Sequence, residues 1–108
     1  VTPDGKLIMV TCSGSDNVAL INADTNTQIT TIDVDDEPIG IDISSDGILA
    51  YVANRGSNTV SIINVQNRTL SQTISLSGNP RPFYVAIVPN TYTAIVTLNN
   101  TNQLAVIK

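Results

Sequence analysis

The feature that most constrains this 108-residue chain is an internal repeat. Residues 3–22, PDGKLIMVTCSGSDNVALIN, align with residues 45–64, SDGILAYVANRGSNTVSIIN, at an offset of 42. The first-copy residues that recur are Asp4, Gly5, Leu7, Val10, Gly14, Ser15, Val18, Ile21 and Asn22, followed by Thr27, Thr31 and Ile32. A period of this size indicates one supersecondary unit that is used several times.

A third and weaker copy begins at residue 89, now at an offset of 44. Its matches to the second copy are Val96 with Val52, Asn102 with Asn58, and Ile107 with Ile63. We therefore divide the chain 1–108 into repeats at approximately 3–44, 45–88 and 89–108, the last one incomplete.

Each period predicts four short antiparallel strands. In the second copy these are expected at 39–44, 48–54, 59–65 and 70–76, rich in β-branched residues and separated by turns that contain Gly, Asn and Asp. A four-stranded antiparallel unit of about 42 residues has the size of one β-propeller blade. We therefore predict an all-β chain of about two and a half blades, forming a partial ring or a part of a longer propeller.

The predicted strands also set a phase. If the strand at 39–44 is the innermost strand, a, the chain runs b-c-d, a-b-c-d, a-b-c. Because closed propellers have about four to eight blades, we expect the remaining blades of a longer chain as partners, with a self-assembling chain as the alternative. If the chain stands alone, its terminal strands near LIMVTC and QLAVIK carry unpaired edges that invite strand addition or aggregation.

The second copy resembles the YVTN-type β-propeller repeat, whose core is a YVTN strand, a short GSN turn and a VSVID-like strand. Residues 51–54, YVAN, stand at the name motif, with alanine where the family often has threonine. Residues 56–58 supply GSN and residues 60–64 supply VSIIN, while the SDG at 45–47 matches the family's SPDG-like turn.

The other copies depart from this motif. The first has MVTC at residues 9–12 but keeps a similar turn, and the third has IVTL at 95–98. The resemblance implies the propeller fold over nearly the whole chain. For function it implies only a range, since such propellers serve binding, surface-layer and enzymatic roles.

Charge and composition exclude several classes of function. The net charge is −4, and the basic residues Lys6, Arg55, Arg68, Arg81 and Lys108 are scattered, which argues against nucleic acid as a partner. Wholly apolar runs are only a few residues long, so no membrane span is expected. There is no histidine, and Cys12 is alone, so we predict no enzyme, no metal and no cofactor.

Acidic residues fall in two segments that have the look of cation loops. Residues 33–37, DVDDE, and 22–26, NADTN, could offer oxygen ligands to Ca²⁺, but both lack the Gly and distal Glu of a calcium loop. We favour solvated loops for both. We expect Asp4 and Asp46 to form turns by accepting hydrogen bonds from backbone amides.

Two further kinds of site remain as candidates. Asn67 and Asn99 begin N-x-S/T sequons, which only a secretory host would glycosylate. Arg81 and Tyr84 flank the entry to an inner strand, near the expected axial mouth, and are the candidate ligand contacts. The structural alternative is that Phe83 belongs to the core and Tyr84 packs on a neighbouring blade.

From these observations we predict a non-catalytic binding or scaffold module of a secreted or cell-surface propeller. Its loops would be presented to a protein or glycan ligand. Two alternatives stay open: a part of a lactonase-like propeller hydrolase whose catalytic residues lie in other blades, and a structural subunit that assembles through open sheet edges.

Overall fold

The computed structural model describes residues 1–108 and consists of ten strands without a helix. The strands are β1 (Leu7–Cys12), β2 (Asn17–Asn22), β3 (Thr27–Asp33), β4 (Pro38–Ile43), β5 (Leu49–Asn54), β6 (Thr59–Asn64), β7 (Thr69–Ser75), β8 (Pro82–Ile87), β9 (Ala94–Leu98) and β10 (Gln103–Ile107). The all-β prediction is confirmed. A helix long and apolar enough to cross a bilayer is not among these elements.

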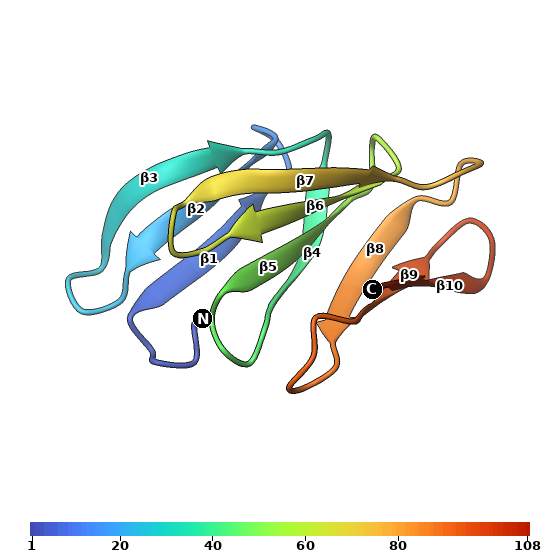
Figure 1. Ribbon diagram of the computed structural model, residues 1–108. Helices are drawn as coiled ribbons and strands as arrows, with labels where there is room; N and C mark the ends of the chain where they lie inside the picture. Colours follow the sequence, from blue (N-terminus) through green and yellow to red (C-terminus); the bar gives the residue numbers. More distant parts are fainter.

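The strands form three antiparallel sheets that lie side by side in chain order (Figure 1). Blade 1 is β1-β2-β3, blade 2 is β4-β5-β6-β7 and blade 3 is β8-β9-β10. This order confirms the predicted phase of three, four and three strands. In this order β1 pairs only with β2, and β10 pairs only with β9.

The core consists of two apolar layers, one between each pair of blades. The first layer joins Met9, Val18, Leu20 and Ile32 of blade 1 to Ala50, Val52 and Ile63 of blade 2, with Val65 beside them. The second joins Tyr51, Ala53, Val60 and Ile62 of blade 2 to Ile87, Ala94, Val96 and Ile107 of blade 3. Blade 2 therefore has both faces buried, as expected for a unit that is stable only when stacked.

The first strands of blades 2 and 3 approach each other closely at a glycine. A Cβ added to Gly40 in β4 would lie 2.3 Å from the carbonyl oxygen of Phe83 and 2.8 Å from the Cα of Tyr84. In both blades the pairing of the first strand is irregular just here, between Pro38 and Ile41 and between Pro82 and Val85. Only glycine leaves room for β8 at this distance.

The turn that precedes β1 in blade 1 is built in the same way as the turn that precedes β5 in blade 2. In blade 2, Ser44 Oγ donates to Asp46 Oδ1 at 2.6 Å, and the Ile48 amide donates to the same oxygen at 3.0 Å. In blade 1, Thr2 Oγ1 donates to Asp4 Oδ1 at 2.7 Å, which is the equivalent of the bond from Ser44 to Asp46. These bonds confirm the predicted turn role of both aspartates, and they lower the pKa of each carboxyl group.

Candidate functional site

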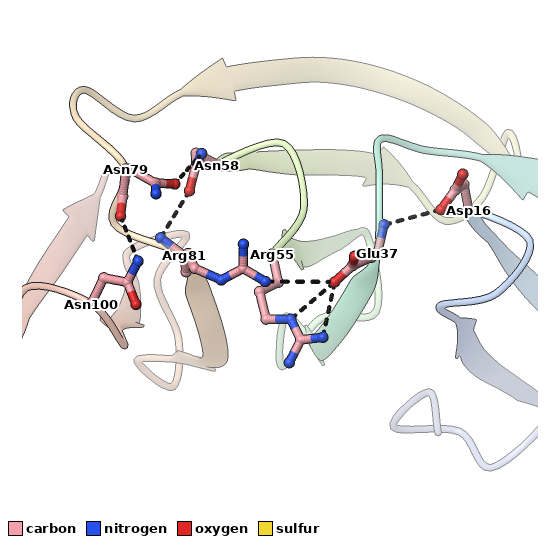
Figure 2. Close-up of polar contacts among 7 residues, drawn as sticks. All are labelled: Asp16, Glu37, Arg55, Asn58, Asn79, Arg81 and Asn100. Atoms are coloured by element: carbon pink, nitrogen blue, oxygen red, sulfur yellow. Dashed lines mark hydrogen bonds and ion pairs between the residues drawn. The ribbon is translucent and has the colours of Figure 1, made fainter.

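A set of polar contacts lies where one blade passes to the next (Figure 2). We call this feature a joint: a connector, residues 34–37 or 76–81, and the hairpin loops it contacts. In the first joint Asp16 Oδ1 accepts the amide of Glu37 at 3.0 Å. In the second joint Asn58 Oδ1 accepts the amide of Arg81 at 2.8 Å. All four residues have left-handed φ angles between 52° and 59°. The two joints therefore have the same backbone conformation and the same side-chain-to-backbone hydrogen bond.

Backbone hydrogen bonds hold each connector on both sides. On the side of the blade that it leaves, Val34 N–H donates to Asp16 O at 3.1 Å, and Leu76 N–H donates to Asn58 O at 3.0 Å. On the side of the blade that it enters, Arg55 N–H donates to Glu37 O at 2.9 Å, and Asn99 N–H donates to Arg81 O at 3.1 Å. Each connector is thereby fixed to two blades at once.

Side chains of both joints meet around Glu37 (Figure 2). Its Oε2 accepts from Arg55 Nη2 at 2.9 Å and from Arg55 Nε at 3.1 Å, and Arg81 Nη2 lies 3.8 Å away. The three side chains are 34 to 43% exposed, so these ion pairs add little to stability. The Arg81 guanidinium makes no hydrogen bond, so its planar set of N–H donors is engaged only in this long ion pair with Glu37.

The predicted ligand contacts, Arg81 and Tyr84, lie at the start of β8. Tyr84 is 64% exposed and its ring stands edge-on to Phe83, with 4.7 Å between centroids. Phe83 is half-buried and belongs to neither core layer, so the expected core position of Phe83 is wrong, whereas the packing of Tyr84 on a neighbouring blade stays a prediction. Arg55 Cζ lies 5.8 Å from the Phe83 ring centroid. Sequence reasoning missed Arg55 and Glu37, because their contacts join residues far apart in the chain.

The acidic run 33–37 makes more side-chain contacts with the rest of the protein than we predicted. Asp35 Oδ2 accepts from Thr59 Oγ1 at 2.8 Å, and Glu37 is held in the first joint. A wholly solvated loop is therefore the wrong description, because two of its carboxylates attach blade 1's connector to blade 2. In the other segment, Asn22 Oδ1 accepts the amides of Asp24 and Thr25 in an exposed hairpin.

The glycosylation candidates lie in exposed hairpins. Asn67 lies in the loop between β6 and β7, and its backbone N–H donates to Asn64 Oδ1 at 2.9 Å. Asn99 follows β9 and is part of the second joint through its backbone, while the residue itself is exposed. Modification of either residue stays a prediction. Cys12 is half-buried, with its Sγ 3.7 Å from the carbonyl oxygen of Val10.

The YVAN segment at 51–54 is buried, and its polar side chains make hydrogen bonds inside the protein. Tyr51 Oη donates to the carbonyl oxygen of Tyr92 in blade 3 at 2.7 Å, and burial raises the pKa of Tyr51. Asn54 is fully buried, and its Nδ2 donates to Thr59 Oγ1 and Ser61 Oγ. These contacts tie the segment to the hairpin that follows and to the next blade.

A hollow between the turns that precede β5 and β9 is lined by Ser45, Asp46, Asn90, Thr91 and Tyr92. The Tyr92 hydroxyl donates to Asp46 Oδ2, and the Asn90 amide donates to Ser45 Oγ at 2.8 Å. The hydrogen bond to Asp46 raises the pKa of Tyr92. Since each of these groups already bonds across the blades, the hollow is a second structural contact between the turns.

Three sheets of this shape, stacked through two equivalent joints, are successive blades of a β-propeller. The comparisons with solved structures give the same fold. Hydrazine synthase of Kuenenia stuttgartiensis is similar with a TM-score of 0.92 and 24% identity, over 100% of this chain and 31% of that one. Virginiamycin B lyase from Staphylococcus aureus gives 0.84 and 19%, over 100% and 36%.

The WD40 β-propeller domain of Doa1 is also similar, with a TM-score of 0.78 and 17% identity, over 95% of this chain and 33% of that one. The chain therefore spans about a third of the length of these structures. No family model matches the sequence. No curated protein matches it either. At such identities the likeness establishes the fold alone.

Proposed function

We propose that the chain is a non-catalytic binding or scaffold module of a secreted or cell-surface propeller of the YVTN type. Its joints would hold the loops around Arg81 rigid and present them to a protein or glycan partner. The observation that carries this proposal is the cluster of Arg55, Arg81, Phe83 and Tyr84 at one end of the second joint.

Arginine and tyrosine, with tryptophan, are the residues enriched at the energetic centres of interfaces. In this cluster the backbone of Arg81 is fixed by bonds to two blades, so a partner would meet a preorganised loop. Tyr84 adds a large exposed aromatic surface beside it in the chain. Rigid support with accessible donors and an aromatic ring suits recognition of a polar partner.

Other polar groups of the chain favour a non-catalytic role. The side chains with shifted pKa values, namely Asp4, Asp46, Tyr51 and Tyr92, all donate or accept hydrogen bonds within or between turns. Their shifts follow from these structural bonds and from burial. The secreted or surface location rests on the resemblance of residues 51–64 to the YVTN repeat.

The test is a ligand screen with matched variants. The chain is probed on a glycan array and against a phage-displayed peptide library, and ligands that bind are measured by titration calorimetry. We expect Arg81→Lys and Tyr84→Ala each to weaken binding at least ten-fold, because the guanidinium fork and the aromatic ring are lost.

Two controls change an arginine and an exposed apolar side chain elsewhere. Arg68→Lys alters an arginine that also has a positive φ, 58°, in the exposed hairpin between β6 and β7, and Leu70→Ala alters an exposed apolar side chain. Neither should affect binding. Equal losses in all four variants, or ligands that respond to none of them, would refute the proposed surface.

A further inference from the structure

The dipeptide Asp-Gly occurs twice in the chain, at residues 4–5 and 46–47, in equivalent turns of the first two repeats. In such a pair the backbone nitrogen of the glycine can attack the side-chain carboxyl group of the aspartate, because glycine has no side chain to hinder the approach. Gly5 and Gly47 have φ angles of 72° and 76°, so the two turns have the same backbone conformation. A difference in reactivity between them must therefore come from their surroundings.

The turn of residues 44–48 is held by blade 3. The Tyr92 hydroxyl donates to Asp46 Oδ2, and the backbone N–H of Asn90 donates to Ser45 Oγ at 2.8 Å. The other carboxylate oxygen, Asp46 Oδ1, accepts two hydrogen bonds from within the turn. Both oxygens of this carboxylate are therefore engaged, and Gly47 beside it is half-buried.

The turn of residues 2–6 receives no such bonds from blade 2. The two turns do lie against each other, since a Cβ added to Gly47 would be 3.4 Å from Pro3 Cδ. Pro3, however, stands at the repeat position of Ser45 and has no hydroxyl group. Ile48 stands at the repeat position of Tyr92 and cannot donate from its side chain. The residues of the two repeats themselves thus decide which turn is held.

The hydrogen bonds of the first turn are all local. Thr2 Oγ1 and the backbone N–H of Lys6 both donate to Asp4 Oδ1, at 2.7 and 3.0 Å, and the Gly5 N–H donates to the Thr2 carbonyl oxygen at 2.9 Å. Asp4 and Gly5 are exposed, and nothing lies within 4 Å of a Cβ added to Gly5. Opening of this short turn alone frees both reacting groups, whereas the second turn must also separate from blade 3.

We propose that Asp4 is a site of spontaneous isomerisation to isoaspartate, and that its counterpart Asp46 is protected by the hydrogen bonds to blade 3. In the first step the Gly5 nitrogen forms a bond to Cγ of the neutral Asp4 carboxyl group. The amide proton and the carboxyl hydroxyl leave as water, which closes a five-membered imide.

In the second step a water molecule adds to one of the two imide carbonyl groups. Addition at Cγ breaks the new bond and restores aspartate. Addition at the main-chain carbonyl of Asp4 breaks its bond to the Gly5 nitrogen and gives isoaspartate. The chain keeps its mass, its backbone gains one methylene group, and the former main-chain carbonyl becomes a free carboxylate.

The charge of the two carboxyl groups acts in the same direction. Only the neutral form can lose its hydroxyl as water, and hydrogen bonds that lower the pKa make this form rarer. The Thr2 hydroxyl is the main cause of the lowered pKa of Asp4. For Asp46 the Ser44 hydroxyl comes first, and the Tyr92 hydroxyl of blade 3 adds to it. The inference is independent of the proposed ligand surface, because neither turn belongs to it.

The parent chain carries the first comparison, which needs no variant. The folded full chain is aged at neutral pH and physiological temperature and then digested, and isoaspartate at residues 4 and 46 is quantified by liquid chromatography with electron-transfer fragmentation. We expect isoaspartate to form about ten-fold faster at Asp4 than at Asp46, because two hydrogen bonds to blade 3 restrain only the second turn. Synthetic peptides of residues 1–8 and 43–50 lack all blade contacts and should isomerise at similar rates.

Variants of the full chain locate the protection. Tyr92→Phe removes one bond to blade 3 and should raise the rate at Asp46 about five-fold, with the rate at Asp4 unchanged. Tyr84→Phe is the matched control, since it removes a hydroxyl group from an exposed tyrosine outside both turns, and it should alter neither rate. Asp4→Glu should abolish the product at residue 4, because glutamate would have to close a six-membered ring. Circular dichroism verifies that each variant is folded.

Several results would overturn the inference. These are equal rates at Asp4 and Asp46 in the folded chain, and no isoaspartate at Asp4 in the time in which the peptide of residues 1–8 converts. An unchanged rate at Asp46 in Tyr92→Phe would show that blade 3 does not protect this turn. A preference for Asp4 of the same size in the two peptides would assign the difference to neighbouring residues and not to the contacts between blades.

Discussion

The face of blade 2 that meets blade 3 and the corresponding face of blade 3 have nearly the same apolar pattern and opposite surroundings. Val60 and Ile62 are 0% and 8% exposed, whereas their counterparts Leu104 and Val106 are 63% and 55% exposed. The repeat therefore encodes a face made for stacking. Whether such a face becomes core depends on a neighbour and not on its own residues.

The two faces differ at one position of the first strand. Gly40 lets β8 lie against β4, but the residue 44 positions later is Tyr84, an exposed and bulky side chain. A following first strand cannot approach β8 as β8 approaches β4 while that phenol ring keeps its place. The apolar face is thus repeated, while the close backbone approach at Gly40 is found between β4 and β8.

The largest effect is expected from Gly40→Ala. The new Cβ would collide with backbone atoms of Phe83 and Tyr84, so we expect a loss of about 3 kcal/mol in the free energy of unfolding, measured by urea denaturation. Gly14→Ala is the control, since nothing lies within 4 Å of its Cβ, and it should stay within about 0.5 kcal/mol of the parent. Equal stability of the two variants would disprove the close approach of β4 and β8.

The next effect compares the equivalent positions directly. Val60→Ala leaves a cavity in the second core layer and should cost about 2 kcal/mol. Leu104→Ala removes more apolar atoms but from an exposed site, so a change within about 0.5 kcal/mol is expected. If Leu104→Ala costs as much in the dilute chain, the face of blade 3 is covered in solution.

A smaller difference separates the two asparagines. Asn58→Gly preserves the left-handed backbone and removes bonds to the Arg81 amide and to Asn79 Oδ1, which should cost about 1.5 kcal/mol. Asn102→Gly removes no bond and should be near neutral, within about 0.5 kcal/mol. Thermal unfolding of both variants measures this, and a neutral Asn58→Gly would show that the side chain does not hold the joint.

The smallest effect concerns the turns and pH. The pKa of Asp46 is lowered from 3.8 by the Ser44 hydroxyl, then by the Tyr92 hydroxyl of blade 3. A lowered folded pKa stabilises the protein above the unfolded value, and this stabilisation is lost as the pH falls below about 4 through the folded pKa. Asp46→Asn should therefore flatten the acid limb of the stability curve, and Tyr92→Phe should do so in part. An unchanged acid limb in both would contradict the link between the two turns.

Much of the fold could be predicted because its signals are local. The turn residues around Asp46 and Asn58 fix hairpins within a few positions, and the 42-residue echo shows that the pattern is reused. The predicted second-copy strands agree with β4 to β7 to within a residue at most ends. The role of the aspartates in the turns followed from the same local chemistry.

The candidate site could be predicted only in part. Position in the repeat placed Arg81 and Tyr84 at the entry to an inner strand, but it gave no sign that Arg55 and Glu37 would join them. Glu37 was expected in solvent, because a run of acidic residues by itself does not reveal a partner 18 residues away. The core assignment of Phe83 was wrong for a different reason. The pairing of β8 with β9 is irregular after Pro82, and this breaks the alternation of buried and exposed side chains along β8.

The sequence by itself determined the strands, their turns and the need for stacking, since hairpins and alternating side chains are written in neighbouring residues. Only the tertiary structure decided which residues meet between blades: Asp16 with Glu37, Asp46 with Tyr92, and Gly40 with the backbone of β8. The physical reason is that such contacts depend on the distance and angle between stacked sheets. These are set by the packing of whole faces and not by any short stretch of chain.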